Sequence, residues 1–266
     1  MRGAVAGGSE STVDAGLWAL RQGGNAIDAA IAATLMAGVA EPLLTGLAGA
    51  GIATVRFEGE VFYADFFANM PGCGTPDGEP APMAEVSIDY GPTTQVFNVG
   101  KGSAAVPGLP AGMWGLQKRF GRLSMSDLVE PAARAAEVGV PVTPGFARVC
   151  ELLWPILART DAVRRLFSSN SGPLTAGETY RCPALAETLR KFGQDPHFLS
   201  DGGGAQQLLD HLGAGSLMTA ADLAGQQCRI RPALGVKFRE ATVWVPGSPS
   251  AAGLGVANTL AVLEQS

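Results

Sequence analysis

The sequence predicts an α+β fold in which helices cover a sheet built from distant parts of the chain. Two helical patterns come first, and a pair of apolar segments with the composition of strands follows them. Helical patterns then fill the middle of the chain, and strand-like segments return near its end, so strands far apart in sequence must come together. The chain has 266 residues, of which 47% are hydrophobic, which is enough for one large core.

The first two helices have clear starting signals. Ser11 and Asp14 fit a capping box for a helix that runs to Gln22. Asn25 can cap the next helix, over residues 26–40, in which small apolar residues occupy nearly every face. Such a helix is buried on all sides. We expect the few strands of this chain to leave part of it for an obligate interface with another chain.

A glycine-rich segment and an apolar hairpin follow. Residues 52–57 and 61–67 are rich in apolar and aromatic side chains and flank Glu58-Gly59-Glu60, which predicts a hairpin. The preceding GLAGAGI segment, residues 46–52, follows a helix and enters a strand. This is the reverse of the order that a nucleotide-binding loop needs, so the glycines indicate tight backbone packing. Residues 72–94 are dense in Pro, Gly and acidic residues, which predicts a long surface excursion.

The remainder of the chain is mostly helical until two strands near its end. Proline in the first turn or a hydroxyl cap marks the start of several of these helices. Helices are predicted over residues 110–120, 126–138, 144–158, 183–192, 204–212 and 219–225, strands over 234–238 and 242–245, and a last helix over 254–264. No repeat or domain linker is evident, so we expect residues 1–266 to form a single domain.

Composition argues against several classes of function. The 19 basic and 24 acidic residues give a net charge of −5, and no basic run could follow a phosphate backbone, so we expect no nucleic-acid partner. The N-terminus lacks a signal-peptide core and the most apolar segment is too short to span a bilayer, so we expect a cytoplasmic protein with no membrane partner. Four scattered cysteines and two isolated histidines predict no disulfide framework, no metal site and no cofactor.

No catalytic group can be assembled from these residues. The sequence contains no nucleophile elbow of the form G-x-S-x-G, and His197 and His211 lie in polar segments without a matching Ser or Cys. Thr93-Thr94 has no identifiable base. We therefore predict that this chain contains no catalytic residue.

Four segments carry a resemblance to a known family. In chain order they are GLWALRQGGNAIDAAIAATLMAGVAEPLLTGLAGAGI, VPGLPAGMWGLQKRFGRLSMSDLVEPAARAAEVGVPV, TAADLAG and PGSPSAAGLGVANTLAVLE. Within them, the signatures L-R-x-G-G-N-A-x-D-A-A and E-P-x-x-x-G-x-x-G-x-G are too long for chance agreement. Over most of its length the chain thus resembles the N-terminal, large-subunit part of gamma-glutamyltranspeptidases.

The resemblance implies an αββα sandwich of the N-terminal-nucleophile hydrolase type and a precursor that cuts itself by autoproteolysis. In that family the N-terminal threonine of the small subunit is the nucleophile, and its own α-amine is the base. The chain therefore resembles a large (alpha) subunit, or a precursor cut short, with the nucleophile on another polypeptide. The implied partner is a small (beta) subunit with an N-terminal threonine, in a heterodimer or a dimer of heterodimers.

One loop departs from the family pattern. In ADFFANMPG, residues 64–72, alignment on Asp65 and Pro71 places Phe67 where the family has an arginine that grips the α-carboxylate of a γ-glutamyl substrate. A phenyl ring leaves that carboxylate without its cation, which costs about 2–5 kcal/mol, or roughly two to three decades in affinity. The resemblance and this departure together predict a small-molecule substrate that is not a γ-glutamyl compound.

Three residues of this loop are candidates for substrate binding. Phe67 lines the pocket in one interpretation; in the other, Phe66 and Phe67 alternate along a strand end, one in the core and one in a neighbouring interface. Asn69 binds a ligand amide or carboxylate, or else it bonds its own turn backbone. Asp65 is expected to orient the loop rather than to act on substrate.

Four functions stay open for the complete enzyme. The first is a hydrolase that acts through a threonyl acyl-enzyme on another amide, as in cephalosporin-acylase-like or oxamate-hydrolase-like relatives. The second is a C–C bond hydrolase of secondary metabolism, in actinobacterial pathways to the alkylproline units of lincosamides and pyrrolobenzodiazepines. The third is a true γ-glutamyl hydrolase or transpeptidase, and the fourth is a catalytically inactive binding subunit.

Overall fold

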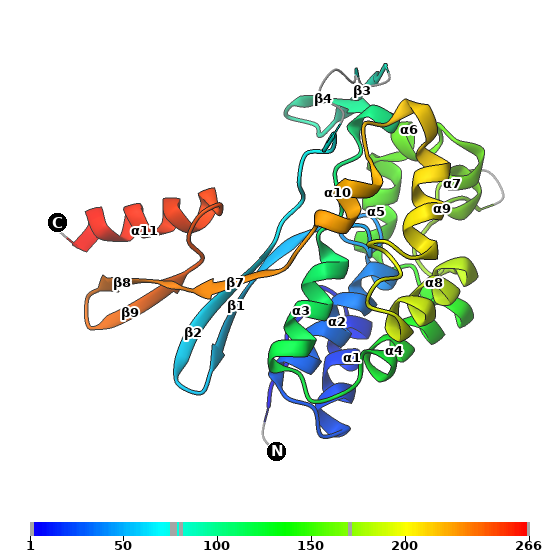
Figure 1. The fold of residues 1–266 in the computed structure, drawn as a ribbon. Helices are drawn as coiled ribbons and strands as arrows, with labels where there is room; N and C mark the ends of the chain where they lie inside the picture. Colours follow the sequence, from blue (N-terminus) through cyan, green and yellow to red (C-terminus); the bar gives the residue numbers. More distant parts are fainter. Residues whose placement is uncertain (1–2, 75–78, 80–81, 170–171, 265–266) are drawn as a thin grey trace.

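A body of helices stands beside a long antiparallel sheet, and a hairpin with one helix projects from the far end of that sheet (Figure 1). The computed structural model describes residues 3–74, 79, 82–169 and 172–264. The helices are α1 (Glu10–Arg21), α2 (Ala26–Ala40), α3 (Leu109–Phe120), α4 (Met125–Val138), α5 (Pro144–Leu152), α6 (Trp154–Leu157), α7 (Asp161–Leu166), α8 (Pro183–Gln194), α9 (Gly203–Leu212), α10 (Ala220–Gly225) and α11 (Ala251–Glu264). The strands are β1 (Gly51–Phe57), β2 (Glu60–Phe66), β3 (Ala84–Asp89), β4 (Thr94–Val99), β5 (Val140–Pro141), β6 (Thr179–Tyr180), β7 (Arg229–Pro232), β8 (Leu234–Phe238) and β9 (Ala241–Val245).

Side-chain caps determine where the first two helices begin. The Ser9 hydroxyl accepts a hydrogen bond from the Thr12 amide at 3.3 Å, so α1 begins directly after Ser9. The predicted cap at Ser11 is wrong, because Ser11 already lies inside the helix. The predicted cap at Asn25 is confirmed, and it is reinforced by the Asp28 carboxylate, which accepts from the Asn25 amide at 2.7 Å.

The largest core surrounds α2. Ile31, Ala32 and Val39 are fully buried, and α1, α3 and α4 of the same chain pack around them. The expectation that part of α2 awaits another chain is therefore wrong. Three helices of the same chain cover α2, and the sequence pattern of α2 alone does not show that these helices pack against it.

A buried carboxylate explains the N-A-x-D-A-A signature. Asp28 is fully buried, and its carboxylate accepts hydrogen bonds from the amides of Arg122 at 3.0 Å and Leu123 at 3.2 Å as well as from Asn25. The Asn25 side-chain amide donates to the Phe120 carbonyl at 2.6 Å. Because these groups satisfy one another, the start of α2 is held to the turn that ends α3.

The main sheet joins strands from distant parts of the chain in the order β1-β2-β7. The predicted hairpin is confirmed, with Gly51 opposite Phe66 in an antiparallel register. The third strand, β7, pairs with β2 so that Asp65 lies opposite Arg229. We did not predict β7, because it has only four residues, RIRP, of which two are charged.

The remaining differences from prediction concern short elements. The excursion at 72–94 holds a hairpin instead of irregular chain: β3 and β4 pair antiparallel, with Val86 and Ile88 buried on alternate positions of β3. Residues 75–78 and 80–81 of that excursion lie outside the described residues. The predicted helix at 144–158 is divided into α5 and α6, and α7 was not predicted.

The projecting unit consists of β8, β9 and α11 (Figure 1). Both predicted strands are confirmed, and α11 begins at Ala251, earlier than predicted. Apolar side chains of α11 are exposed, including Leu254 at 41%, Val256 at 47% and Leu263 at 54%. The exposed apolar helix of this chain is thus α11 and not α2. None of the helices in the described part of the chain has the length and apolar character of a membrane span.

Candidate functional site

The two adjacent phenylalanines at the end of β2 have different environments. Phe66 is 5% exposed, and its ring occupies the space beside two glycines: a Cβ at Gly112 would lie 2.2 Å from Phe66 Cγ, and one at Gly51 would lie 2.8 Å from Phe66 Cε2. Phe67 is 58% exposed. Phe66 is therefore the core residue of the pair, and Phe67 is the one whose ring a ligand or another chain can contact.

The backbone after Phe66 is held against the segment that leads into α3. A Cβ at Gly108 would lie 1.9 Å from the Phe66 carbonyl oxygen, so only glycine allows this approach. Next along the chain, Asn69 and Val106 form an isolated antiparallel bridge, in which the Val106 amide donates to the Asn69 carbonyl at 2.9 Å. The loop that follows β2, residues 67–73, which we call the exit loop, is thus fixed by main-chain contacts at its first half.

Asp65 orients the start of the exit loop. Its carboxylate is mostly buried and accepts a hydrogen bond from the Phe67 amide at 3.1 Å. Its other oxygen lies 3.7 Å from the guanidinium of Arg231, one strand away on β7. Hydrogen bonding to the Tyr63 hydroxyl, with a smaller contribution from the Asp65 charge, raises the pKa of Arg231. Arg231 therefore stays cationic and is already paired with a carboxylate.

Cys228 lies close enough to Asp65 for the carboxylate charge to affect it. Burial raises the pKa of this thiol to about 11, and the Asp65 charge adds to the shift. At neutral pH the sulfur is consequently a protonated thiol, which is a poor nucleophile. Cys228 is thus a packing residue of the core rather than a nucleophile.

Gln226 clamps the exit loop through both ends of its side-chain amide. Its nitrogen donates to the Phe67 carbonyl at 2.8 Å, and its oxygen accepts from the side-chain amide of Asn69. Gln226 is 9% exposed, so these bonds form with little competition from water. Asn69 therefore uses its amide to hold Gln226 rather than its own turn. Sequence analysis missed Gln226, because no local pattern links it to a loop 159 residues away.

A second clamp holds the far end of the exit loop. The Asp222 carboxylate accepts hydrogen bonds from the amides of Gly72 and Cys73, each at 2.9 Å, and from the Thr219 amide at 2.8 Å. Burial alone would raise the pKa of the Asp222 carboxyl, but these backbone N–H groups outweigh burial and hold that pKa below its usual value. Asp222 also completes the capping box of α10, which accounts for the TAADLAG segment.

The clamps place the exit loop beside a cleft. Gln226 lines a cleft of about 240 Å³ together with Pro107, Pro110, His197 and Asp201. His197 Nδ1 lies 3.0 Å from Asp201, and the Ser200 hydroxyl donates to the same carboxylate at 3.0 Å. Since the hydroxyl is bonded to the carboxylate and not to the ring, these three side chains do not form a nucleophile–base pair.

What the site can do chemically follows from its charges. Residues 67–73 contain no Lys or Arg, and the cation beside Asp65 is already paired. Within the part of the chain that the structure describes, no group of three or more His, Cys, Asp and Glu could hold a metal ion. The exit loop is therefore a firmly held, uncharged wall with an exposed phenyl ring, and it adjoins the cleft through Gln226 rather than through residues 67–73 themselves.

Comparison with known proteins gives a consistent family. The gamma-glutamyltranspeptidase family model matches residues 12–266. The chain is 30% identical over 264 residues to glutathione hydrolase 3 of Arabidopsis thaliana, covering 98% of this chain and 40% of that protein. It is 30% identical over 253 residues to the acylase ACY 1 proenzyme of Pseudomonas sp. (strain V22), covering 94% of this chain and 45% of that protein. The chain thus spans less than half the length of these two relatives.

The fold also matches a solved structure. The gamma-glutamyltranspeptidase of Helicobacter pylori superposes with a TM-score of 0.87 and 23% identity, over 99% of this chain and 75% of that chain. The likeness extends over nearly every described element. The α+β class and the N-terminal-nucleophile hydrolase fold predicted from the sequence are therefore confirmed.

Proposed function

We propose that this chain, which belongs to the gamma-glutamyltranspeptidase family, is the large-subunit part of a hydrolase whose nucleophile is the N-terminal threonine of a small subunit. The observation that carries the proposal is the exit loop, which is firmly held and exposes a phenyl ring, in a chain whose described residues assemble no nucleophile–base pair. A wall of this kind needs a catalytic group from elsewhere. The name proenzyme, carried by the acylase relative, fits a precursor that is cut into two subunits.

The exposed apolar helix supports a partner of this kind. Helix α11 has apolar side chains that are between 41% and 54% exposed to solvent, namely Leu254, Val256 and Leu263. A second polypeptide that packs on α11 and extends the sheet past β7 would bury this apolar surface and complete the αββα sandwich. Residues 1–266 would then be the single-domain large subunit of a heterodimer, which could pair further as a dimer of heterodimers.

The substrate that we propose is an amide whose acyl group is apolar or carries a ring near Phe67. The phenyl ring is 58% exposed, and the alignment on Asp65 and Pro71 gives it the position of the family's carboxylate-binding arginine. We do not expect Arg231 to replace that arginine, because its guanidinium is already paired with the Asp65 carboxylate 3.7 Å away. In the reaction, the hydroxyl of the partner's threonine would attack the amide carbonyl and form an ester acyl-enzyme as the C–N bond breaks, and the threonine's α-amine would pass the hydroxyl proton to the departing amine. Water would then hydrolyse the ester, while this chain holds the acyl group against Phe67.

The test is to purify the chain with every polypeptide that accompanies it, determine their intact masses, and assay a panel of donors. We expect a second chain that begins with threonine, and turnover of an aryl- or alkyl-acyl amide above that of a γ-glutamyl anilide. A lone chain without turnover would favour an inactive binding subunit. If the γ-glutamyl anilide is the preferred donor, the enzyme is a γ-glutamyl hydrolase, in line with the name glutathione hydrolase of the first relative. Cleavage of an alkylproline precursor alone would identify a C–C bond hydrolase.

A further inference from the structure

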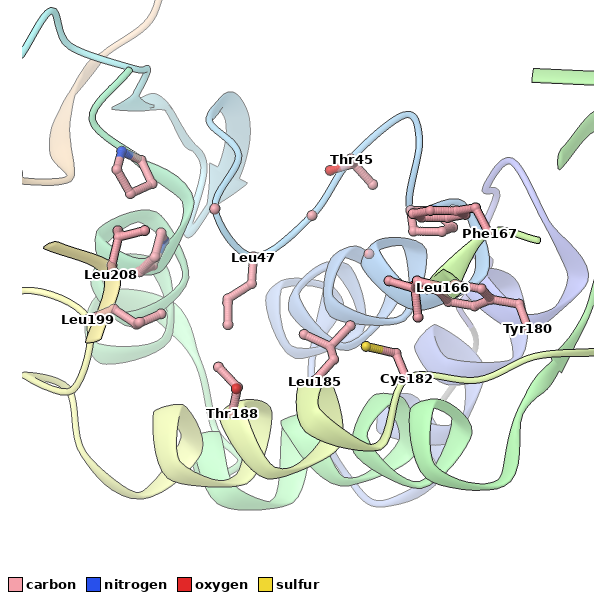
Figure 2. Close-up of a pocket in the computed structure, with 16 residues that line it drawn as sticks. Thr45, Leu47, Leu166, Phe167, Tyr180, Cys182, Leu185, Thr188, Leu199 and Leu208 are labelled. Atoms are coloured by element: carbon pink, nitrogen blue, oxygen red, sulfur yellow. The ribbon is translucent and has the colours of Figure 1, made fainter. Parts of the chain in front are cut away.

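A second hollow of the molecule lies among the helices and adjoins the cleft beside Gln226, since Pro107, Pro110 and Leu199 line both. Its volume is about 410 Å³, and the glycine-rich segment after α2 forms one of its walls. Figure 2 shows the apolar side chains of Leu47, Phe167, Leu185, Leu199 and Leu208 around this hollow, contributed by segments that are distant in sequence. Asp65, Phe67, Asn69 and Gln226 are not among its lining residues. We call it the helical cavity.

Among the described residues, no charged side chain lines the helical cavity. All sixteen lining residues are uncharged, and the polar groups among them are the hydroxyls of Thr45, Thr188 and Tyr180 and the thiol of Cys182. The Thr188 hydroxyl already donates to the Ala184 carbonyl at 2.9 Å. The Tyr180 ring is stacked on Phe167 with a centroid separation of 5.3 Å, and burial raises the pKa of its hydroxyl, which therefore stays neutral.

The glycine-rich segment leaves space on the cavity side. At Gly46 an added Cβ would meet no heavy atom within 4 Å among the residues described, and the backbone there is not in the left-handed region. At Gly38 and Gly49, by contrast, an added Cβ would meet the backbone of Gly46 at 3.3 Å and 2.8 Å. The glycines at 38 and 49 are thus explained by close packing, whereas the one at 46 borders open space.

We propose that the helical cavity is a binding site for an uncharged, apolar small molecule larger than a single benzene ring. A dry cavity of about 150 Å³ is enough for benzene, and ligand pockets generally enclose about 300–1,000 Å³, so a volume of about 410 Å³ suits a fused ring system or an alkyl chain. A charged ligand is excluded, because no lining side chain could compensate its lost hydration. The few hydroxyls permit one alcohol or carbonyl group. This site is additional to the proposed amide hydrolysis.

The experiment is a fluorescence titration of the protein, with any polypeptide that accompanies it, using the neutral dye N-phenyl-1-naphthylamine. We expect saturable binding and displacement of the dye by decanol. Decanoate, which has the same chain length but carries a charge, should displace it about tenfold less effectively or worse. Equal displacement by the alcohol and the carboxylate would overturn the proposal, as would a protein that binds no dye because the partner polypeptide fills the cavity.

Substitutions in the cavity wall test whether the dye binds in the helical cavity. Gly46→Leu places a side chain in the open space and should abolish displaceable binding, as should Thr188→Phe from the α8 wall if the first variant does not fold. Gly203→Leu is the matched control, since an added Cβ there also meets nothing within 4 Å but Gly203 does not line the cavity. Loss of binding in the cavity variants with retention in the control supports the site. Unchanged binding in folded Gly46→Leu would place the dye elsewhere, for instance on α11, and would sink the proposal.

Discussion

Phe66 and Phe67 are neighbours in sequence, but a substitution at each should have a different kind of effect. Phe67→Arg places a cation on the exposed wall, so we expect lower kcat/KM for the native donor and higher use of a γ-glutamyl anilide. Phe66→Arg buries an unpaired charge among tightly packed glycines and should lower the free energy of unfolding by about 3–5 kcal/mol. Donor kinetics and urea unfolding of both variants measure these effects.

A specific experimental result would contradict the prediction for Phe67. If the wild-type assembly hydrolyses γ-glutamyl anilide as efficiently as any other donor, and Phe67→Arg changes nothing, then Phe67 does not occupy the carboxylate-binding position. The case against a γ-glutamyl substrate would then be lost, although the exposed position of the ring would stand.

Gln226 should matter for the substrate more than for the fold. Gln226→Ala leaves the Phe67 carbonyl and the Asn69 amide without their partner, so we expect the free energy of unfolding to fall by about 1–2 kcal/mol. KM for the preferred donor should rise more than kcat falls, because the exit loop loses its position. Gln227→Ala is the control, since Gln227 is exposed beside it. Identical KM values in both variants would argue against a positioning role.

The Asp222 clamp predicts a pH-dependent contribution to stability. The pKa of Asp222 is lower in the folded chain than its usual value, so its contribution is complete above an unfolded pKa of about 4 and is lost as the pH falls through the folded value. Asp222→Asn should therefore be destabilising by about 1.5–3 kcal/mol at pH 7, and less so below about pH 4. Asp210→Asn, at an exposed carboxylate, is the control. A difference between wild type and Asp222→Asn that is independent of pH would contradict this account.

At the scale of whole elements, the helix that exposes apolar surface is α11 and not α2 as expected. The sequence pattern of α2 suggested a helix in need of a partner chain, yet α1, α3 and α4 bury it. In α11 the buried residues are Gly253 and Ala257, and other apolar residues of the helix are exposed. An element buried by its own chain contributes to folding, whereas an exposed apolar element contributes to assembly.

This difference is testable at α11. The double variant Val256→Ser and Leu263→Ser should leave the melting temperature of the chain nearly unchanged, because both side chains are about half exposed. It should weaken retention of the small subunit, as measured by native mass spectrometry. Val138→Ser, which removes an apolar side chain with 65% exposure from the end of α4, should have no such effect. Equal retention in all three proteins would show that α11 is not the interface.

For the whole molecule, we expect activity to depend on the second polypeptide and not on a metal. The chain alone should turn over no donor, because its described residues assemble no nucleophile–base pair. Activity of the assembly should survive a chelator, since no cluster of metal-ligating residues occurs among the described residues. Turnover by the isolated folded chain, or a loss with chelator that zinc restores, would each show that a catalytic or metal site has been missed.

What the sequence by itself determined is local. The cap at Asn25, the hairpin at Glu58-Gly59-Glu60, most of the helices and the α+β class follow from patterns within one turn or one strand, and the family signatures extend over these same segments. The prediction that Phe67 replaces a family arginine also comes from the sequence, through the alignment on Asp65 and Pro71. These features need no knowledge of which distant segments meet.

The tertiary structure alone decided which residues hold the site. Gln226 reaches Phe67 across 159 positions, and Asp222 reaches Gly72 across 150. The pairing of β7 with β2, the burial of α2 by other helices and the space beside Gly46 likewise depend on packing between segments that share no local pattern. A hydrogen bond or a cavity of this kind leaves no periodicity in the chain, because its energy arises only when the fold has brought the two segments together.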